Sequence, residues 1–218
     1  MIRTATLLSC VLCLPAAAQG LSIDFNARER SNTDPTPSPT EDGFVGFTID
    51  DSGSTIGGVT VTLSNLSNDR FRDNLTDAGA FTYDDLYDDF LFYRGSGDAS
   101  ITLDGLVPDT AYSITLYAYD GASNDGSKAD WYGNGSFLFQ ATIDDTAITS
   151  NDASAFTAQA ITDASGTLVL LADPRDDLTG RQTNVFINGL QVSVVPTPAT
   201  ATLLAAASFA LLPSRRRR

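Results

Sequence analysis

The chain has 218 residues, no histidine and a formal net charge of −14, so its surface is strongly acidic. All 27 acidic residues lie between Asp24 and Asp177, and the part of the chain that runs on to Arg181 holds only eight basic residues, which leaves it a net charge of −19. A field of this sign repels nucleic acids and anionic lipids, and it excludes nucleic-acid binding as a function.

The first 18 residues have the three parts of a secretory signal peptide. Arg3 provides the positive charge, a short apolar run follows, and small residues precede a cleavage point after Ala18. Both cysteines, Cys10 and Cys13, lie in this segment. The exported chain is therefore expected to contain no disulfide, no thiolate metal site and no cysteine nucleophile.

After the predicted signal, short stretches alternate apolar and polar residues with a period of two and are rich in β-branched and aromatic side chains, as strands are. Gly, Asn, Asp and Pro separate these stretches, and a Pro-rich segment at 27–42 is expected to be a surface loop or a crossover. With no helical periodicity between them, the strands predict one antiparallel β-sandwich over residues 19–194. The predicted strands are 21–25, 44–49, 58–63, 90–93, 100–104, 112–119, 136–143, 166–171 and 185–194.

The last predicted strand contains the dipeptide Asn188-Gly189, which allows two interpretations. The apolar residues on either side fit a hairpin with a two-residue turn at this point. The alternative, which we favour, is one continuous strand with a bulge at the glycine.

The composition leaves only carboxylates for catalysis. Serine–histidine and cysteine–histidine machinery and the usual zinc sites are excluded, because the exported chain has neither histidine nor cysteine. Paired carboxylates of the kind that hydrolyse glycosides remain. The densest acidic cluster, however, lies near predicted turns, where such groups are usually solvated or bind ions; it consists of Asp84, Asp85, Asp88 and Asp89. We therefore predict that the protein is not an enzyme.

One predicted loop, at 120–134, combines acids and amides with the single tryptophan of the chain. Calcium takes six to eight oxygen ligands from such side chains and from carbonyl groups. The predicted calcium ligands are Asp120, Asn124, Asp125 and Asp130, with the segment 84–89 as the second choice. Sugar binding needs an aromatic face beside a few polar groups, and the predicted contacts are Trp131, Tyr132 and Asn134. The alternative for Trp131, which we favour, is that it plugs the end of the sandwich core.

The C-terminal segment, from Val195 on, has a composition unlike the rest of the chain. Pro196 and Pro198 precede 14 largely apolar residues at 199–212, and the chain ends with Arg215, Arg216, Arg217 and Arg218. As a helix the apolar run is roughly 21 Å long, short of the ~30 Å hydrocarbon core, so it crosses a bilayer only where the bilayer thins. The arginines then fix the cytoplasmic side. The alternative is a tail that adheres to anionic lipid.

In order, spacing and position, this segment resembles the PEP-CTERM sorting signal, in a VPTP variant of planctomycete type in which Thr197 replaces the usual glutamate. The resemblance implies recognition by an exosortase, a membrane protease-transpeptidase, after a transient stay in the inner membrane. The middle of the chain, at 86–93, 101–117 and 186–192, resembles jelly-roll domains of carbohydrate-binding type that often carry this tag. This second resemblance implies a sandwich like that of a carbohydrate-binding module.

Together these features predict an exported protein with a structural or adhesive role at the cell surface or in an exopolysaccharide matrix. The alternative is a calcium-dependent carbohydrate-binding module, with Ca²⁺ as its cofactor and exopolysaccharide as its partner. A carboxylate-based glycoside hydrolase is the third interpretation.

Overall fold

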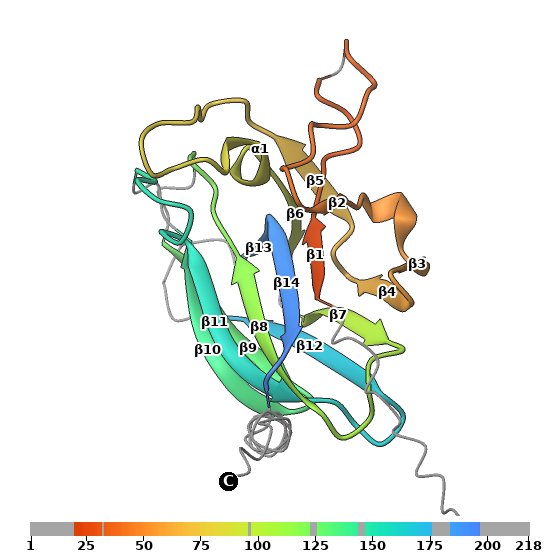
Figure 1. The fold of residues 1–218 in the computed structure, drawn as a ribbon. Coiled ribbons are helices and arrows are strands. Elements are labelled where there is room, and N and C mark those ends of the chain that lie inside the picture. The colour runs from red at the N-terminus through yellow and green to blue at the C-terminus, as the bar shows by residue number, and fades with distance from the viewer. Residues whose placement is uncertain are drawn as a thin grey trace, which may run out of the picture.

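The computed structural model describes residues 20–31, 33–95, 97–122, 126–143, 147–175 and 184–196. Within these ranges the chain is almost entirely β-structure, arranged in three sheets (Figure 1). Neighbouring strands pair antiparallel, except that β2 lies parallel to β1. The antiparallel, all-β class predicted from the sequence is confirmed.

The five-stranded sheet has the order β11 (Ala155–Ile161), β8 (Ala111–Tyr117), β14 (Gly189–Val194), β1 (Leu21–Asp24) and β2 (Val45–Gly46). The six-stranded sheet has the order β10 (Ser136–Ile143), β9 (Ser127–Gly133), β12 (Thr167–Pro174), β7 (Ala99–Asp104), β4 (Val59–Ser64) and β3 (Ser54–Ile56). The three-stranded sheet consists of β13 (Asn184–Ile187), β6 (Asp89–Arg94) and β5 (Asn68–Phe71). A 3₁₀ helix, η1 (Ile49–Asp51), follows β2, and a single-turn helix, α1 (Asp84–Tyr87), precedes β6.

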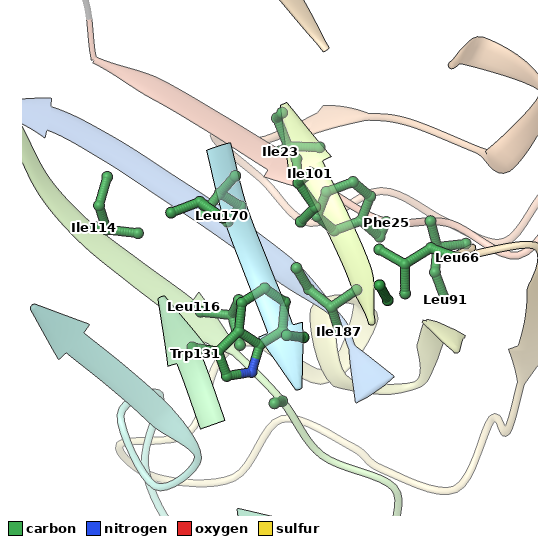
Figure 2. Packing of buried hydrophobic residues seen from close by; sticks show 14 of the residues in the cluster. Ile23, Phe25, Leu66, Leu91, Ile101, Ile114, Leu116, Trp131, Leu170 and Ile187 are labelled. Carbon is green, nitrogen blue, oxygen red and sulfur yellow. The ribbon is translucent and has the colours of Figure 1, made fainter. Parts of the chain in front are cut away.

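One apolar core joins the inner faces of the sheets. Ile114 and Leu116 of β8 belong to the same buried cluster as Trp131 of β9 and Leu170 of β12 (Figure 2). Burial alternates along β12, because successive side chains of a strand point to opposite faces. Each fully buried large side chain contributes about 1.5–3 kcal/mol. The core therefore supplies stability to the described part of the chain, which contains no cysteine.

Four strands are absent from the sequence prediction: β3, β5, β9 and β11. Small and polar residues outnumber large apolar ones in these strands, and β9 reads Ser-Lys-Ala-Asp-Trp-Tyr-Gly, which resembles a loop. Partners on both sides, β10 and β12, hold β9 in the sheet, so tertiary pairing overrides its local preference. The predicted strand at 44–49 is too long, since β2 has two residues and Thr48 caps η1 through hydrogen bonds to the carboxylate of Asp51.

Asn188 and Gly189 mark the place where the chain crosses from one sheet to another. β13 pairs with β6 in the three-stranded sheet, and β14 pairs with β8 and β1 in the five-stranded sheet. The hairpin interpretation is wrong, because β13 and β14 do not pair with each other. The interpretation that we favoured, one continuous strand, is wrong as well, because the strand is interrupted at Asn188. A Cβ on Gly189 would lie 2.6 Å from Leu86 Cδ1 and 3.0 Å from the Ile23 carbonyl oxygen, so the crossing requires glycine.

The described residues contain no helix that is long and apolar enough to cross a membrane. The predicted signal peptide at 1–18 and the predicted tail from 197 on, with Pro198 and the four arginines, lie outside the described residues.

Candidate functional site

Trp131 lies in β9 with 1% of its surface exposed, and its indole is part of the core (Figure 2). The nearest ring is that of Phe139, with the centroids 6.5 Å apart. A buried indole offers no face to a sugar, which corrects the prediction of a sugar contact at this residue. The alternative, a tryptophan that fills the core, is confirmed.

Asp120 and Asp130, two of the predicted calcium ligands, each pair with an arginine. The guanidinium of Arg72 donates to both carboxylate oxygens of Asp120 at 2.9 Å. Arg175 Nη1 lies 2.7 Å from Asp130 Oδ2, and Gln140 Nε2 donates to Asp130 Oδ1 at 2.8 Å. Each carboxylate is therefore neutralised by a cation of the chain itself.

The other two predicted ligands, Asn124 and Asp125, lie outside the described residues. Asp130 is a strand residue rather than a loop residue, because the second half of the predicted loop forms β9. Within the ranges that the structure describes, no three His, Cys, Asp or Glu side chains are grouped to hold a metal ion. Calcium binding by this loop stays a prediction.

Asn134, predicted to contact sugar, holds a turn at one end of the six-stranded sheet. Its backbone has a φ of +45°, in the left-handed region that asparagine tolerates. Its amide donates to the carbonyl oxygens of Ile161 and Thr167, and its carbonyl oxygen accepts from the Val169 N–H. The side chain is engaged in joining the β9–β10 turn to β12 and the end of β11.

Replacing Asn134 with alanine is expected to lower the free energy of unfolding by about 2 kcal/mol, because three hydrogen bonds and a side chain that tolerates positive φ are lost together. Urea unfolding measures the change. Asn65→Ala is the matched control, since Asn65 also has a positive φ but its amide makes one hydrogen bond, to the Asp98 carbonyl oxygen. An equal loss in the two variants would contradict the role of the three bonds.

Tyr132, the remaining predicted sugar contact, lies on the outer face of the six-stranded sheet. Its ring packs edge-to-face against Phe137 of β10 at a centroid distance of 5.8 Å, and Phe137 is 59% exposed. Beside Tyr132 the sheet is hollowed by about 350 Å³. The hollow is lined by Asp98, Tyr132, Gly135, Val169, Leu171 and Asp173. Sequence analysis missed all of these except Tyr132, because the strand pairing of β7, β9 and β12 brings them together.

Rows of hydroxyl groups extend this outer face across β7 and β4. Ser100 lies opposite both Leu171 of β12 and Ser64 of β4 in the strand register. Thr102 lies opposite Val169 and Thr62 in the same way, and side chains that face each other in an antiparallel pair share one face of the sheet. The face therefore passes from an aromatic pair, through a hollow, to a hydroxyl-lined strip.

A second feature is a pair of buried carboxylates, Asp24 at the end of β1 and Asp89 at the start of β6. Both side chains are 0% exposed. Burial raises the pKa of Asp24 to about 8, and the charges of Glu41 and Asp85 add to the rise. Burial, together with the charge of Asp24, holds the pKa of Asp89 well above its usual value. The expectation that the acidic cluster around Asp89 is solvated is wrong at this residue.

No family model and no curated protein matches the sequence. Among solved structures, the fold is similar to the ANXUR1 extracellular domain from Arabidopsis thaliana, with 11% identity and a TM-score of 0.50 over 82% of this chain and 48% of that chain. The beta-glucuronidase 2 of Bacteroides uniformis matches with 10% identity and a TM-score of 0.46, over 82% of this chain and 18% of that one.

The CBM36-1 domain of a multidomain xylanase from the hindgut metagenome of Trinervitermes trinervoides has 11% identity and a TM-score of 0.36, over 64% of this chain and 99% of that chain. The present chain thus spans about half the length of the ANXUR1 domain. At this identity the likeness to that domain shows a shared β-sandwich fold.

Proposed function

We propose that this protein is an exported β-sandwich that adheres to a neutral polysaccharide through the outer face of its six-stranded sheet. The observation that carries the proposal is the pair formed by the half-buried Tyr132 and the exposed Phe137, beside a hollow that two carboxylates, Asp98 and Asp173, help to line. The role is structural or adhesive, as the sequence predicts, and it uses a sugar-binding surface on a strand face.

The surface has the two properties that sugar recognition needs. A pyranose ring presents an apolar C–H face that packs on an aromatic ring, and Tyr132 and Phe137 provide such rings. Its hydroxyl groups need a few fixed polar partners. The carboxylates of Asp98 and Asp173 and the hydroxyl groups of β4 and β7 are the partners at this face.

The charge of the chain selects among polysaccharides. At a formal net charge of −14, the protein repels acidic polymers at moderate ionic strength. A neutral polysaccharide, such as a glucan or a xylan, is not repelled by the acidic protein. The preferred ligand is therefore a neutral, extended polysaccharide, laid across the strands of the six-stranded sheet.

Support for the extracellular setting comes from the sequence and from the fold. The signal peptide and the PEP-CTERM-like segment remain predictions for export and for sorting by an exosortase. The ANXUR1 structure, which is similar to this chain with a TM-score of 0.50, is an extracellular domain. The proposal is one of binding without catalysis, in line with the absence of histidine from the sequence.

Replacing Tyr132 with alanine is expected to weaken binding to the preferred neutral polysaccharide about tenfold or more, because aromatic anchors at the centre of an interface carry much of the binding energy. Affinity electrophoresis against a panel of soluble glucans, xylan and mannan, with alginate as the acidic comparison, measures the change. Val45→Ala is the control, since Val45 is 47% exposed in a strand of the five-stranded sheet.

Two results would contradict the proposal. One is that no neutral polysaccharide retards the full-length protein while alginate does. The other is that Tyr132→Ala and Val45→Ala bind the same glycan equally well. Release of reducing ends from the bound glycan would instead favour the glycoside hydrolase interpretation.

A further inference from the structure

In both Asp24 and Asp89, one carboxylate oxygen accepts hydrogen bonds and the other accepts none from the described residues. Asp24 Oδ2 accepts the Glu41 N–H at 2.7 Å, and Asp89 Oδ2 accepts the Ala27 N–H at 3.3 Å and the hydroxyl of Ser38. The second oxygen, Oδ1 in both residues, is buried and has no hydrogen-bond partner among the residues that the structure describes. Buried carboxylates without partners are rare in native proteins, because burying an isolated charge costs several kcal/mol.

No cation among the described residues forms an ion pair with these carboxylates. Four ion pairs join described residues, and Asp24 and Asp89 take part in none of them. The nearby charged groups are acidic as well, since the carboxylates of Glu41, Asp85 and Asp88 act electrostatically on this pair. Buried carboxyl groups in proteins are paired with cations, bound to metal ions or kept neutral by a proton. The site is thus short of positive charge.

The loop at 27–42 contacts both carboxylates and carries neutral oxygen atoms. The loop at 27–42 folds back over β1, where Asn26 Nδ2 donates to the Ser38 carbonyl oxygen at 3.0 Å and to Thr40 Oγ1 at 3.2 Å. The Ser38 hydroxyl then reaches Asp89 on β6. A Cβ on Gly46 would lie 2.5 Å from Thr40 Oγ1 and 2.8 Å from Asn26 Oδ1, so these oxygens crowd against the backbone of β2.

We propose that Asp24 and Asp89 bind one calcium ion between β1, β6 and the loop at 27–42. Two carboxylates match the charge of one divalent cation. Among the described residues the site offers oxygen atoms as ligands and no sulfur or imidazole, which selects hard cations over zinc. Ca²⁺ accepts six to eight ligands in irregular geometry, including hydroxyl and carbonyl oxygens and water, whereas Mg²⁺ requires near-octahedral geometry and sheds its water reluctantly.

The two carboxylates are the anchors, and neutral oxygens complete the coordination. The Ser38 hydroxyl, carbonyl oxygens of the loop at 27–42 and water are the donors available at this place. Such an ion connects three segments that are far apart in the sequence. It provides the cross-link that a chain with no cysteine beyond Cys13 lacks.

The test uses the full-length protein, stripped with EDTA, dialysed and titrated with CaCl₂ or MgCl₂. Calorimetry is expected to give one equivalent of Ca²⁺, bound more tightly than Mg²⁺. The Tm is expected to rise by about 5–10 °C at a hundredfold excess over Kd. Asp24→Asn and Asp89→Asn should each lose this shift. The control Asp109→Asn, which removes the same charge at an exposed loop position, should keep it.

If neither variant folds, the wild-type protein still decides the question. Terbium, excited through nearby tyrosines such as Tyr87, should luminesce at one equivalent and be displaced by calcium. Its anomalous signal in a crystal should lie between Asp24 and Asp89. The proposal is overturned if neither ion binds, if the signal lies elsewhere, or if both asparagine variants keep the shift.

The calcium proposal stands independently of the polysaccharide proposal, because the two use different residues. Tyr132→Ala is expected to keep the full calcium shift while it loses glycan binding. A calcium shift without glycan binding would refute only the proposed function, and glycan binding without a calcium shift would refute only the metal site.

Discussion

Replacing Asn188 with alanine is expected to lower the free energy of unfolding by roughly 4 kcal/mol, because three buried backbone groups lose their partner at once. The Asn188 side chain is 0% exposed. Its amide donates to the carbonyl oxygens of Tyr87 and Asp89, and its carbonyl oxygen accepts the Tyr119 N–H at 2.6 Å. No water replaces these bonds in a closed interior, so each lost bond carries its full desolvation cost.

Urea unfolding followed by tryptophan fluorescence measures this loss, since Trp131 is the single tryptophan and is buried. Asn151→Ala is the matched control. Its side chain also joins distant segments, donating to Thr82 Oγ1 and accepting the Thr82 N–H, but at the surface. Water takes over these bonds, so the expected loss is about 1 kcal/mol or less. Similar losses in the two variants would show that the buried network is not specially stabilising.

The metal-free protein is expected to lose stability steadily as the pH rises from 5 to 9. Burial raises the pKa of Asp24 from 3.8 to about 8 and that of Glu41 from 4.5 to about 7. Between the pKa of each group in the unfolded chain and its higher pKa in the folded chain, the folded protein keeps protons that the unfolded chain has released. The stability that these two groups contribute through their retained protons is therefore complete below about pH 4 and is lost as the pH rises past 8. For Asp24 alone the loss is on the order of 5 kcal/mol.

Chemical denaturation in EDTA at pH 5, 7 and 9 checks this prediction. Saturating calcium should flatten the pH dependence, because the ion binds the ionised carboxylates and takes the place of the protons. The variant Asp24→Asn should show a weaker pH dependence in EDTA, since asparagine has no proton to release at this buried position. A stability that stays constant from pH 5 to pH 9 without metal would contradict the burial of these groups.

The sequence predicts the strands whose side chains alternate clearly. β7 and β8 are examples, because apolar residues on one face alternate with serine and threonine on the other. β9 could not be predicted in this way. Its inward residues include Ser127 and Ala129, and its outward residues include Lys128, so the contrast between its faces is small. Only its two neighbours in the sheet make it a strand.

The candidate sites likewise could be predicted only in part from the local sequence. Tyr132 could be chosen from its type and its neighbours in the sequence, but Phe137, Asp98 and Asp173 join it through strand pairing alone. Asp24 follows an alternating stretch at 21–23 and has no local feature that marks it as buried. Its burial depends on a loop that folds back over β1 and on Asp89, which lies 65 residues further along the chain. Such juxtapositions follow from topology and packing.

The crossing at Asn188 also determines how the sandwich bears mechanical load. It places β14, the last described strand, between β8 and β1, with antiparallel ladders on both sides. Hydrogen bonds in such ladders lie across the strand axis, so tension applied at Val195 loads both rows together in shear. A strand at the edge of a sheet has only one such row to oppose the same force. Pulled from its C-terminal end, this domain is therefore built to resist force.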